Sequence, residues 1–381
     1  MFGRWQRRAG PTLLALGLVL RIVPAVLIRG TDDVSSWQSW GWYLAQGRNP
    51  YQSPYLIAWP PLWPIWAGLS YVTADVTGIP FHAIGKLLPI AADLVLIAVL
   101  FEAAGEAAAF AYALNPVSIY TTAIHGNFDA LPALCLTVAV VAASRMEERR
   151  AGWWLGIGAA IKTWPLLLLP AVIAPLRSLR TRVRAAAIAI GVFAGALLVA
   201  LPAGRSAVAG ILSYRSAAGW WGISSISWLC GGCIPPAILS AIFYGAMAAV
   251  ALLLLVKQTP AAEGTLLLLL TLFVTTPGFG LQYLVWLVPV ALLADRRRAL
   301  WYSALAAVLI AWEVLVRPYT GHIGETVRML PHADYARSYG RGLDHRYTVL
   351  GRLPLWGFVC WWWLVTLATH ARIRAPKLSR P

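Results

Sequence analysis

Charged residues are scarce in this sequence, and acidic ones are the scarcest. Asp, Glu, Lys and Arg make up 12% of the 381 residues, with 15 acidic side chains against 31 Lys and Arg. A soluble domain typically carries about twice that charged fraction. Hydrophobic residues make up 59%, and apolar runs of about 18 or more residues recur along the chain. The composition therefore excludes an ordinary soluble protein and predicts an all-α, polytopic membrane protein.

Cysteine is also scarce. Four cysteines are too few for a disulfide scaffold. Only Cys230 and Cys233, in the stretch CGGC, lie close together in sequence. That pair predicts either a small disulfide in an oxidising compartment or two buried thiols. A zinc site would need two further ligands nearby, which the sequence does not offer.

A nucleotide-binding fingerprint is missing as well. The stretch GIGAAI, residues 156–161, has neither the third glycine nor the preceding strand of that motif. Without a nucleotide site, a donor of a sugar or phosphoryl group would have to be carried by a lipid.

The net charge of +16 could indicate a nucleic-acid partner, but the basic residues do not follow one polar face. They form short clusters between the apolar runs, which is the pattern of membrane orientation. We therefore expect no nucleic-acid partner. The positive-inside rule places the clusters and both termini in the cytoplasm, with the protein in the plasma membrane. The five clusters span residues 4–8, 145–150, 177–184, 296–298 and 372–380.

An even number of crossings must separate one cytoplasmic cluster from the next. Two apolar segments therefore cannot each be a single crossing. Residues 60–76 carry three prolines near their start, so we expect an interfacial or half-inserted piece. Residues 151–176 should form a hairpin that enters the membrane and returns, broken around Lys162 and Pro165. About 12 crossings result. Besides the two hairpin arms, they are residues 11–28, 83–102, 107–124, 129–145, 185–203, 233–257, 262–278, 281–294, 299–316 and 353–370.

This topology gathers polar segments on the outer face. Residues 1–381 should form one membrane domain, without internal repeats or a separate soluble part. The outer segments are the loops 29–82, 204–232 and 317–352 and the turns 125–129 and 278–283.

Asp32 and Asp33 follow the first predicted crossing on that face. A carboxylate shielded by nearby tryptophans could have a raised pKa and take a proton from an acceptor hydroxyl. Alternatively, both acids cap a short helix that begins near Val34. The sequence leaves both interpretations open.

The turn HGNFD, residues 125–129, lies between two predicted crossings. His125, Asn127 and Asp129 could bind sugar hydroxyls or orient a carboxylate. The alternative is an ordinary turn, with Asp129 as the N-cap of the next helix.

Two of the four lysines lie in or beside apolar segments. An unpaired Lys162 inside the hairpin would cost roughly 2.5–3.5 kcal/mol, so it is a functional candidate whose natural partner is a lipid phosphate. An acid within the membrane, such as Asp93, is the alternative partner. Lys86 is a weaker candidate, because snorkelling at a helix end would explain it.

Six arginines in the loop 317–352 lie on the face where the orientation rule expects few. Some could bind phosphate through bidentate contacts. Alternatively, the loop is solvated and its charges meet anionic headgroups or neighbouring acids. Its three histidines match no metal motif, so we predict no metal site.

Short motifs occur along the chain in a characteristic order. They are TDD, QGRNPY, WPPLW, IGKLLPIAADLVLIAVLF, ALNPVSIYTTAIHGNFDAL, IKTWPLLLLP and GLQYLVWLVP. This series resembles the GT-C glycosyltransferases that use polyprenyl- or dolichyl-phosphate sugars. Within them it resembles the catalytic subunit of GPI mannosyltransferase I and its GT87-like bacterial relatives. The resemblance spans roughly residues 29–290.

The resemblance implies an inverting transfer of a sugar, expected to be mannose, from a polyprenyl-phosphate donor to a lipid or glycan acceptor. The reaction would occur on the extracytoplasmic face with an Asp as general base. No cofactor is expected, although the acid pair leaves room for a divalent metal. Lys86 and His125 join the expected donor- or acceptor-binding residues. The family's functional positions fall on Asp32, Asp33, Gly126, Asn127, Asp129, Lys162, Gln282 and Tyr283.

The sequence departs from the family at two places. Asp32 and Asp33 are adjacent, whereas the family separates its two acids by one residue, so the base is not fixed, with a slight preference for Asp33. His125 replaces an arginine of the family, which leaves the sugar and the acceptor open.

Two other functions are compatible with the sequence. A broken helix and a buried cation also suit a transporter or flippase of a lipid-linked saccharide, although transporters commonly show paired broken helices. A noncatalytic scaffold subunit is the third option, and the outer-face acids and Lys162 argue against it. Membrane lipids are expected partners in every case.

Overall fold

A computed structural model describes residues 10–52, 57–200, 204–214, 218–316 and 345–372. Every regular element in these ranges is a helix, apart from one isolated bridge between Ala218 and Gly278. The predicted all-α membrane protein is therefore confirmed, whereas the total of about 12 crossings stays a prediction. The helices long and apolar enough to cross a membrane span Gly10–Leu27, Phe81–Ala104, Leu179–Ala200, Pro236–Lys257 and Val349–Ala371.

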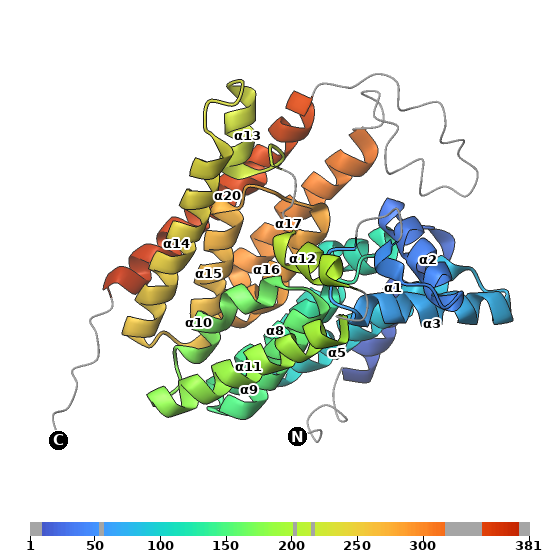
Figure 1. Ribbon diagram of the computed structural model, residues 1–381. Coiled ribbons are helices and arrows are strands. Elements are labelled where there is room, and N and C mark those ends of the chain that lie inside the picture. Colours follow the sequence, from blue (N-terminus) through green and yellow to red (C-terminus); the bar gives the residue numbers. More distant parts are fainter. Residues whose placement is uncertain (1–9, 53–56, 201–203, 215–217, 317–344, 373–381) are drawn as a thin grey trace.

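The chain has an N-terminal and a C-terminal series of helices that pack against each other (Figure 1). The first is α1 (Gly10–Leu27), α2 (Asp32–Ala45), α3 (Leu62–Thr77), α4 (Phe81–Gly85), α5 (Leu87–Ala104), α6 (Glu106–Ala113), α7 (Pro116–Ile119), α8 (Ala130–Ser144), α9 (Glu148–Ile161), α10 (Leu169–Ile173) and α11 (Leu179–Ala200). The second is α12 (Arg205–Ser213), α13 (Gly222–Leu229), α14 (Pro236–Lys257), α15 (Ala261–Thr275), α16 (Leu284–Ala294), α17 (Arg296–Ala311) and α20 (His345–Arg372). Between the two series, α10 packs against α14 and α15, and α12 packs against α11.

The predicted crossing 107–124 consists of three short elements instead of one helix. Gly105, with a φ of 85°, lets α6 fold back along α5. Asn115 interrupts the next stretch, because its side chain accepts the first backbone amides of α7. A π-helical turn, Tyr120–His125, completes the segment and brings His125 to its end.

α9 and α10 form the predicted broken hairpin. α9 ends because Lys162 takes an extended backbone conformation, with φ −152° and ψ 135°. A 3-10 turn, Trp164–Leu168, then leads into α10. The first arm has 14 residues and covers about 21 Å, which is short of a hydrocarbon core of about 30 Å.

Both ends of this hairpin lie at the start of α11. Arg184 pairs with Glu148, the first residue of α9, at 2.9 Å. Arg182 donates to the carbonyl groups of Ala174 and Leu176, which follow α10. The chain therefore turns back at Lys162 so that both ends of the segment meet α11, and its entry into the membrane stays a prediction.

α2 and α3 pack against each other beside α1 (Figure 1). α3 has 16 residues and is not among the candidate spans, and its interfacial position stays a prediction. α2 begins at Asp32 with Thr31 at its N-cap, two residues earlier than predicted. The acids thus occupy the first helical turn, where negative charge favours a helix, and neither acid is the cap.

A buried ion pair joins α1 to α5. Nε of Arg21 donates to the Asp93 carboxylate at 2.7 Å, and both side chains are fully buried. The hydroxyl groups of Tyr112, Ser118 and Thr122 donate to the same carboxylate. The buried charge on Asp93 is therefore both paired and hydrogen-bonded, as an interior acid requires.

Cys230 and Cys233 form a disulfide just after α13. The disulfide alternative for the stretch CGGC is thus confirmed. The other two cysteines, Cys135 and Cys360, are free.

Arg352 has the only described side chain among the six arginines of the loop 317–352. It lies in α20, where Nε donates to Glu313 at 2.8 Å and Nη1 donates to the Trp220 carbonyl at 2.9 Å. Arg352 and Glu313 are both buried. This arginine is therefore committed to packing and not to phosphate. The predicted phosphate contacts of the other five lie outside the described side chains.

Candidate active site

The Asp33 carboxylate lies against two side chains of the outer turn. Asn127 donates from Nδ2 to Oδ2 of Asp33 at 2.9 Å, and Nε2 of His125 lies 3.1 Å from the same oxygen. Because an ionised carboxylate only accepts, Nε2 carries the imidazole proton in this contact. The Asp33 side chain is 44% exposed, and within the described residues its other oxygen, Oδ1, has no hydrogen bond. Asp33 is therefore oriented by the turn and still open to a substrate.

Two glycines allow the chain segments to approach so closely. Gly126 follows the π-helical turn with a φ of 80°, and a Cβ there would lie 2.7 Å from Cε of Lys86. Gly30 has a φ of 105°, and a Cβ there would lie 2.8 Å from the carbonyl oxygen of His125. Thr31 donates its backbone N–H to that carbonyl at 3.2 Å. Any larger residue at either glycine would force α2 away from the turn.

Lys86 lies beneath this contact and is 1% exposed. Its Nζ donates to the carbonyl of Ile28 at 2.5 Å and to that of Ala123 at 2.9 Å. The ammonium group therefore joins the end of α1 to the π-helical turn. Snorkelling is the wrong explanation for Lys86, because the side chain is buried and bonded to backbone carbonyls.

The charge state of Asp33 follows from its neighbours. The surrounding protein removes part of the water from the half-exposed carboxylate, which opposes ionisation, but the hydrogen bonds from His125 and Asn127 and the charges of His125 and Lys162 outweigh this effect. The pKa of Asp33 is consequently lowered. The raised pKa expected from shielding tryptophans is wrong, because two hydrogen-bond donors and nearby positive charge stabilise the ionised carboxylate. Asp33 is thus ionised at neutral pH.

Lys162 is paired with Asp129 and not with Asp93. Its Nζ donates to both carboxylate oxygens, at 2.7 and 2.9 Å, and both side chains are almost fully buried. Asp93 is excluded as the partner because it is committed to Arg21. Four aromatic rings surround the ammonium group, with centroids at 4.6 to 5.6 Å, within the range of cation–π attraction. They belong to Trp59, Phe128, Tyr283 and Trp286.

Asn127 connects the two carboxylate sites. Its Oδ1 accepts from the backbone N–H of Asp129 at 3.1 Å, so its NH₂ group must face Asp33. Asp129 occupies the N-cap position of α8, but its side chain makes no capping hydrogen bond there. The turn therefore orients two carboxylates, that of Asp33 and that of Asp129, which pairs with Lys162.

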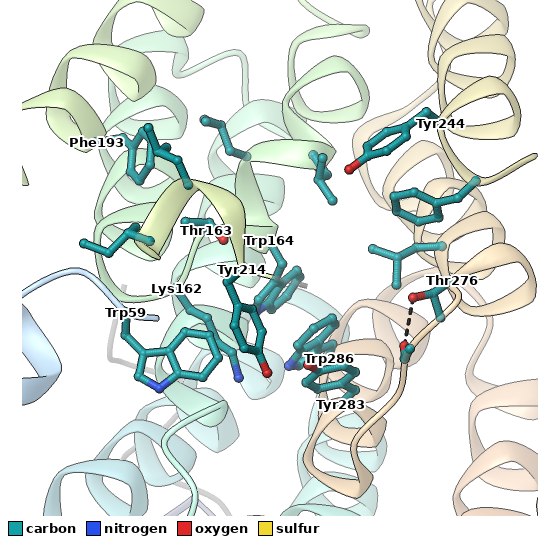
Figure 2. A pocket seen from close by; sticks show the side chains of 17 residues that line it. Trp59, Lys162, Thr163, Trp164, Phe193, Tyr214, Tyr244, Thr276, Tyr283 and Trp286 are labelled. Carbon is teal, nitrogen blue, oxygen red and sulfur yellow. Dashed lines mark hydrogen bonds between the residues drawn. The ribbon is translucent and has the colours of Figure 1, made fainter. Parts of the chain in front are cut away.

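A cavity of about 490 Å³ opens beside Lys162. Figure 2 shows the Lys162 ammonium close to the rings of Trp59 and Tyr214, with Phe193 and Tyr244 further along the cavity. Side chains from α11, α12, α14 and α15 form part of its wall, and these are apolar or aromatic. A cavity with one charged end and an apolar remainder suits a ligand with an anionic head and a hydrocarbon tail.

Tyr214 was missed by the sequence analysis. It follows α12, its ring lies 4.8 Å from that of Trp59, and it lines the cavity. Burial raises the pKa of its phenol, an effect that a hydrogen bond with Tyr283 partly offsets, so the hydroxyl stays protonated. Only its place in the loop 204–232 could have drawn attention to it.

The remaining predicted residues divide between cavity and support. Tyr283 lines the cavity, whereas Gln282 and Lys86 do not. The Gln282 side chain folds over Gly280, with Oε1 only 2.5 Å from where a Cβ of Gly280 would lie. Within the described ranges, no three His, Cys, Asp or Glu residues gather as a metal site requires.

The family model of glycosyltransferase family 87 matches residues 60–277, which is more than half of the chain. The chain belongs to glycosyltransferase family 87. A comparison with curated proteins finds no match. The matched region includes the outer turn and the broken hairpin, whereas Asp33 and Tyr283 lie outside it. The family 87 match does not test the resemblance to GPI mannosyltransferase I.

Membership of family 87 makes this membrane protein a glycosyltransferase. If ionised Asp33 is needed for transfer, Asn127→Ala should move the acidic limb of the pH–activity profile to higher pH. In the wild type the lowered pKa keeps Asp33 charged below the usual aspartate value of about 3.9. Losing the Asn127 donor removes a stabiliser of the charged form, so the pKa of Asp33 rises.

The pH profile of kcat/KM measures this shift, because it reports the pKa of groups in the free enzyme. Gln46→Ala, at the exposed end of α2, is the matched control and should leave the profile unchanged. If Asn127→Ala kept the wild-type limb, the amide would have no part in stabilising the Asp33 charge.

Proposed function

We propose that this family 87 glycosyltransferase transfers a sugar, specifically mannose, from a polyprenyl phosphate to a hydroxyl of a lipid or glycan acceptor, with inversion. The observation that carries the proposal is the Asp33 carboxylate, held open by the outer turn and within electrostatic reach of Lys162. Lys162 in turn forms the charged end of an apolar cavity.

Asp33 is the general base in this proposal. Oδ1 accepts the proton of the acceptor hydroxyl as the hydroxyl oxygen bonds to the anomeric carbon. The bond from that carbon to the phosphate oxygen breaks, and its electron pair leaves with the polyprenyl phosphate. Attack from the face opposite the leaving group inverts the anomeric centre. The hydrogen bonds to Oδ2 keep Oδ1 directed at the acceptor.

Lys162 stabilises the departing phosphate. An ammonium group has three N–H donors, and two of those on Lys162 engage Asp129, so one is left for a phosphate oxygen. The surrounding rings keep water away, which strengthens this contact as charge develops on the leaving group. The Tyr214 hydroxyl, on the same cavity wall, is a second donor to the phosphate or the sugar.

The apolar part of the cavity accommodates the isoprenoid chain of the donor. Phe193, Ile211 and Phe243 line it, and Figure 2 shows Phe193 away from the Lys162 ammonium group. A hydrocarbon chain gains free energy by leaving water for such a surface, and it holds the phosphate near Lys162. The proposed step uses no cofactor.

We place the site on the extracytoplasmic face. The disulfide of Cys230 and Cys233 follows α13 at the end of the loop 204–232, where the predicted crossing 233–257 begins, and disulfides persist in oxidising compartments. Arg182 and Arg184 lie at the opposite end of the hairpin from Lys162, where the positive-inside rule places the cytoplasm.

Purified protein in liposomes tests the proposal directly. Given polyprenyl-phosphate mannose with a labelled sugar, and native membrane lipid extract as acceptor, it should form a labelled glycolipid. Parallel assays with other labelled sugars check the specificity, and transfer of a different sugar would correct the identity of the donor. Label that crossed the bilayer without reacting would identify a transporter and overturn the proposal.

A further inference from the structure

A second cavity lies between α5, α8 and α9, and the proposed reaction does not use it. We call it the α5–α8–α9 groove, and its volume is about 280 Å³. α5 and α9 each pack against α8, and the groove runs between them. Its apolar lining consists of Val95, Ala98, Val99, Leu134, Val138, Val141, Ala142 and Trp154.

The groove has one charged end, lined by Glu102, Arg145, Glu147 and Arg150. Two carboxylates thus lie beside two guanidinium groups. Arg150 and Glu147 are 3.2 Å apart in a largely exposed pair, which is weak in water and does not prevent either group from meeting a ligand. Glu102 and Arg145 are exposed.

This charged end lies away from the candidate active site. Arg145 follows the last residue of α8, whereas Asp129 precedes its first. Arg150 belongs to the first turn of α9, and Lys162 follows its last residue. The groove and the active site therefore lie at opposite ends of the same two helices.

The surroundings of the groove indicate what fills it. α5 belongs to a candidate membrane span, and Val95 on its groove side is 48% exposed. An apolar space offers no hydrogen bonds to water, whereas the membrane supplies hydrocarbon at high concentration. An acyl chain is consequently the occupant that matches the apolar lining.

The charged end selects the headgroup. Guanidinium groups bind phosphate through charge-assisted hydrogen bonds, and carboxylates bind ammonium groups in the same way. A headgroup with both charges satisfies both pairs, whereas an anionic headgroup without an amine would place negative charge against Glu102 and Glu147.

We propose that the α5–α8–α9 groove binds one zwitterionic glycerophospholipid that carries a primary ammonium group. Its acyl chain lies along the apolar lining, its phosphate meets Arg145 and Arg150, and its ammonium group meets Glu102. The bound lipid fills the space between α5 and α9 and so supports α8 from the side away from the active site.

Native mass spectrometry of the detergent-purified full chain, titrated with phosphatidylethanolamine, tests the proposal. Wild type should retain one phosphatidylethanolamine about tenfold more tightly than phosphatidylglycerol or phosphatidylcholine. Val95→Trp narrows the groove, and its matched control is Ile190→Trp, on α11 and 50% exposed. Arg145→Gln removes a phosphate contact, and Arg180→Gln, exposed at the start of α11, is its control.

Val95→Trp and Arg145→Gln should each weaken retention about tenfold, while both controls keep it. All four substituted side chains are exposed, so the variants should fold. Equal retention in wild type and Val95→Trp would overturn the groove as the site. Phosphatidylglycerol binding as tightly as phosphatidylethanolamine would overturn the zwitterionic headgroup. Sugar transfer is not measured, so the result is independent of the proposed reaction.

Discussion

Asp33→Asn is expected to lower sugar transfer by about 10²- to 10⁴-fold, the usual contribution of a general base. The amide keeps the shape of the carboxylate but cannot take the proton of the acceptor. Asp32→Asn should leave transfer close to the wild-type rate, because Asp33 is the acid whose carboxylate is held by the side chains of His125 and Asn127. Initial rates with labelled polyprenyl-phosphate sugar, for both variants in the same liposomes, measure the difference.

The adjacent pair of acids supplies its own control in this experiment. Both substitutions remove one negative charge from the first turn of α2, so their effects on that helix should be alike. Only their effects on transfer should differ. Equal activity of the two variants would show that Asp33 is not the base.

Asp93→Asn is expected to destabilise the protein by roughly 3–5 kcal/mol, because it leaves the Arg21 guanidinium buried without its counter-charge. Arg21 is fully buried and bonds to the carbonyls of Gly17 and Ala113 as well as to Asp93. Those carbonyls cannot neutralise it. Unfolding in mixed micelles with increasing denaturing detergent gives the free-energy difference.

Asp75→Asn is the matched control for this stability measurement. Asp75 is exposed on α3, and its replacement should change the free energy of unfolding by less than about 0.5 kcal/mol. If Asp93→Asn were as stable as this control, the pair of Arg21 and Asp93 would not hold α1 against α5.

The break in the hairpin was predictable from the sequence because two local signals agree there. A charge at Lys162 within an apolar run and a proline three residues later both disfavour a continuous helix. The return of the chain followed from counting basic clusters. Local chemistry thus determined the shape of this segment, and the described contacts at both of its ends confirm it.

The partner of Lys162 was not predictable in the same way. Asp93 and Asp129 are both acids near the membrane, and sequence distance does not tell which one reaches the hairpin. Arg21 decides the matter, because it takes Asp93 and leaves Asp129 for Lys162. In the sequence Arg21 is only a charge inside an apolar run, and its partner lies 72 residues away.

Two further features depended on tertiary contacts. Asp32 and Asp33 are neighbours of the same type, so only the rotation of α2 against the outer turn separates their surroundings. Tyr214 joins the cavity from a loop about 50 residues after Lys162, and a single aromatic residue in a chain with 12% aromatics gives no signal.

In the proposed reaction, the amide of Asn127 has a consequence for the affinities of the two substrates. One end of this group holds the backbone of Asp129, and the other holds Asp33. A donor phosphate bound to Lys162 weakens the bonds of Lys162 to Asp129 and so acts on one end, and an acceptor hydroxyl at Asp33 acts on the other. Thermodynamic reciprocity then requires that each substrate change the affinity of the other by the same factor. A ternary-complex kinetic pattern with a shared interaction factor is the signature of such a link.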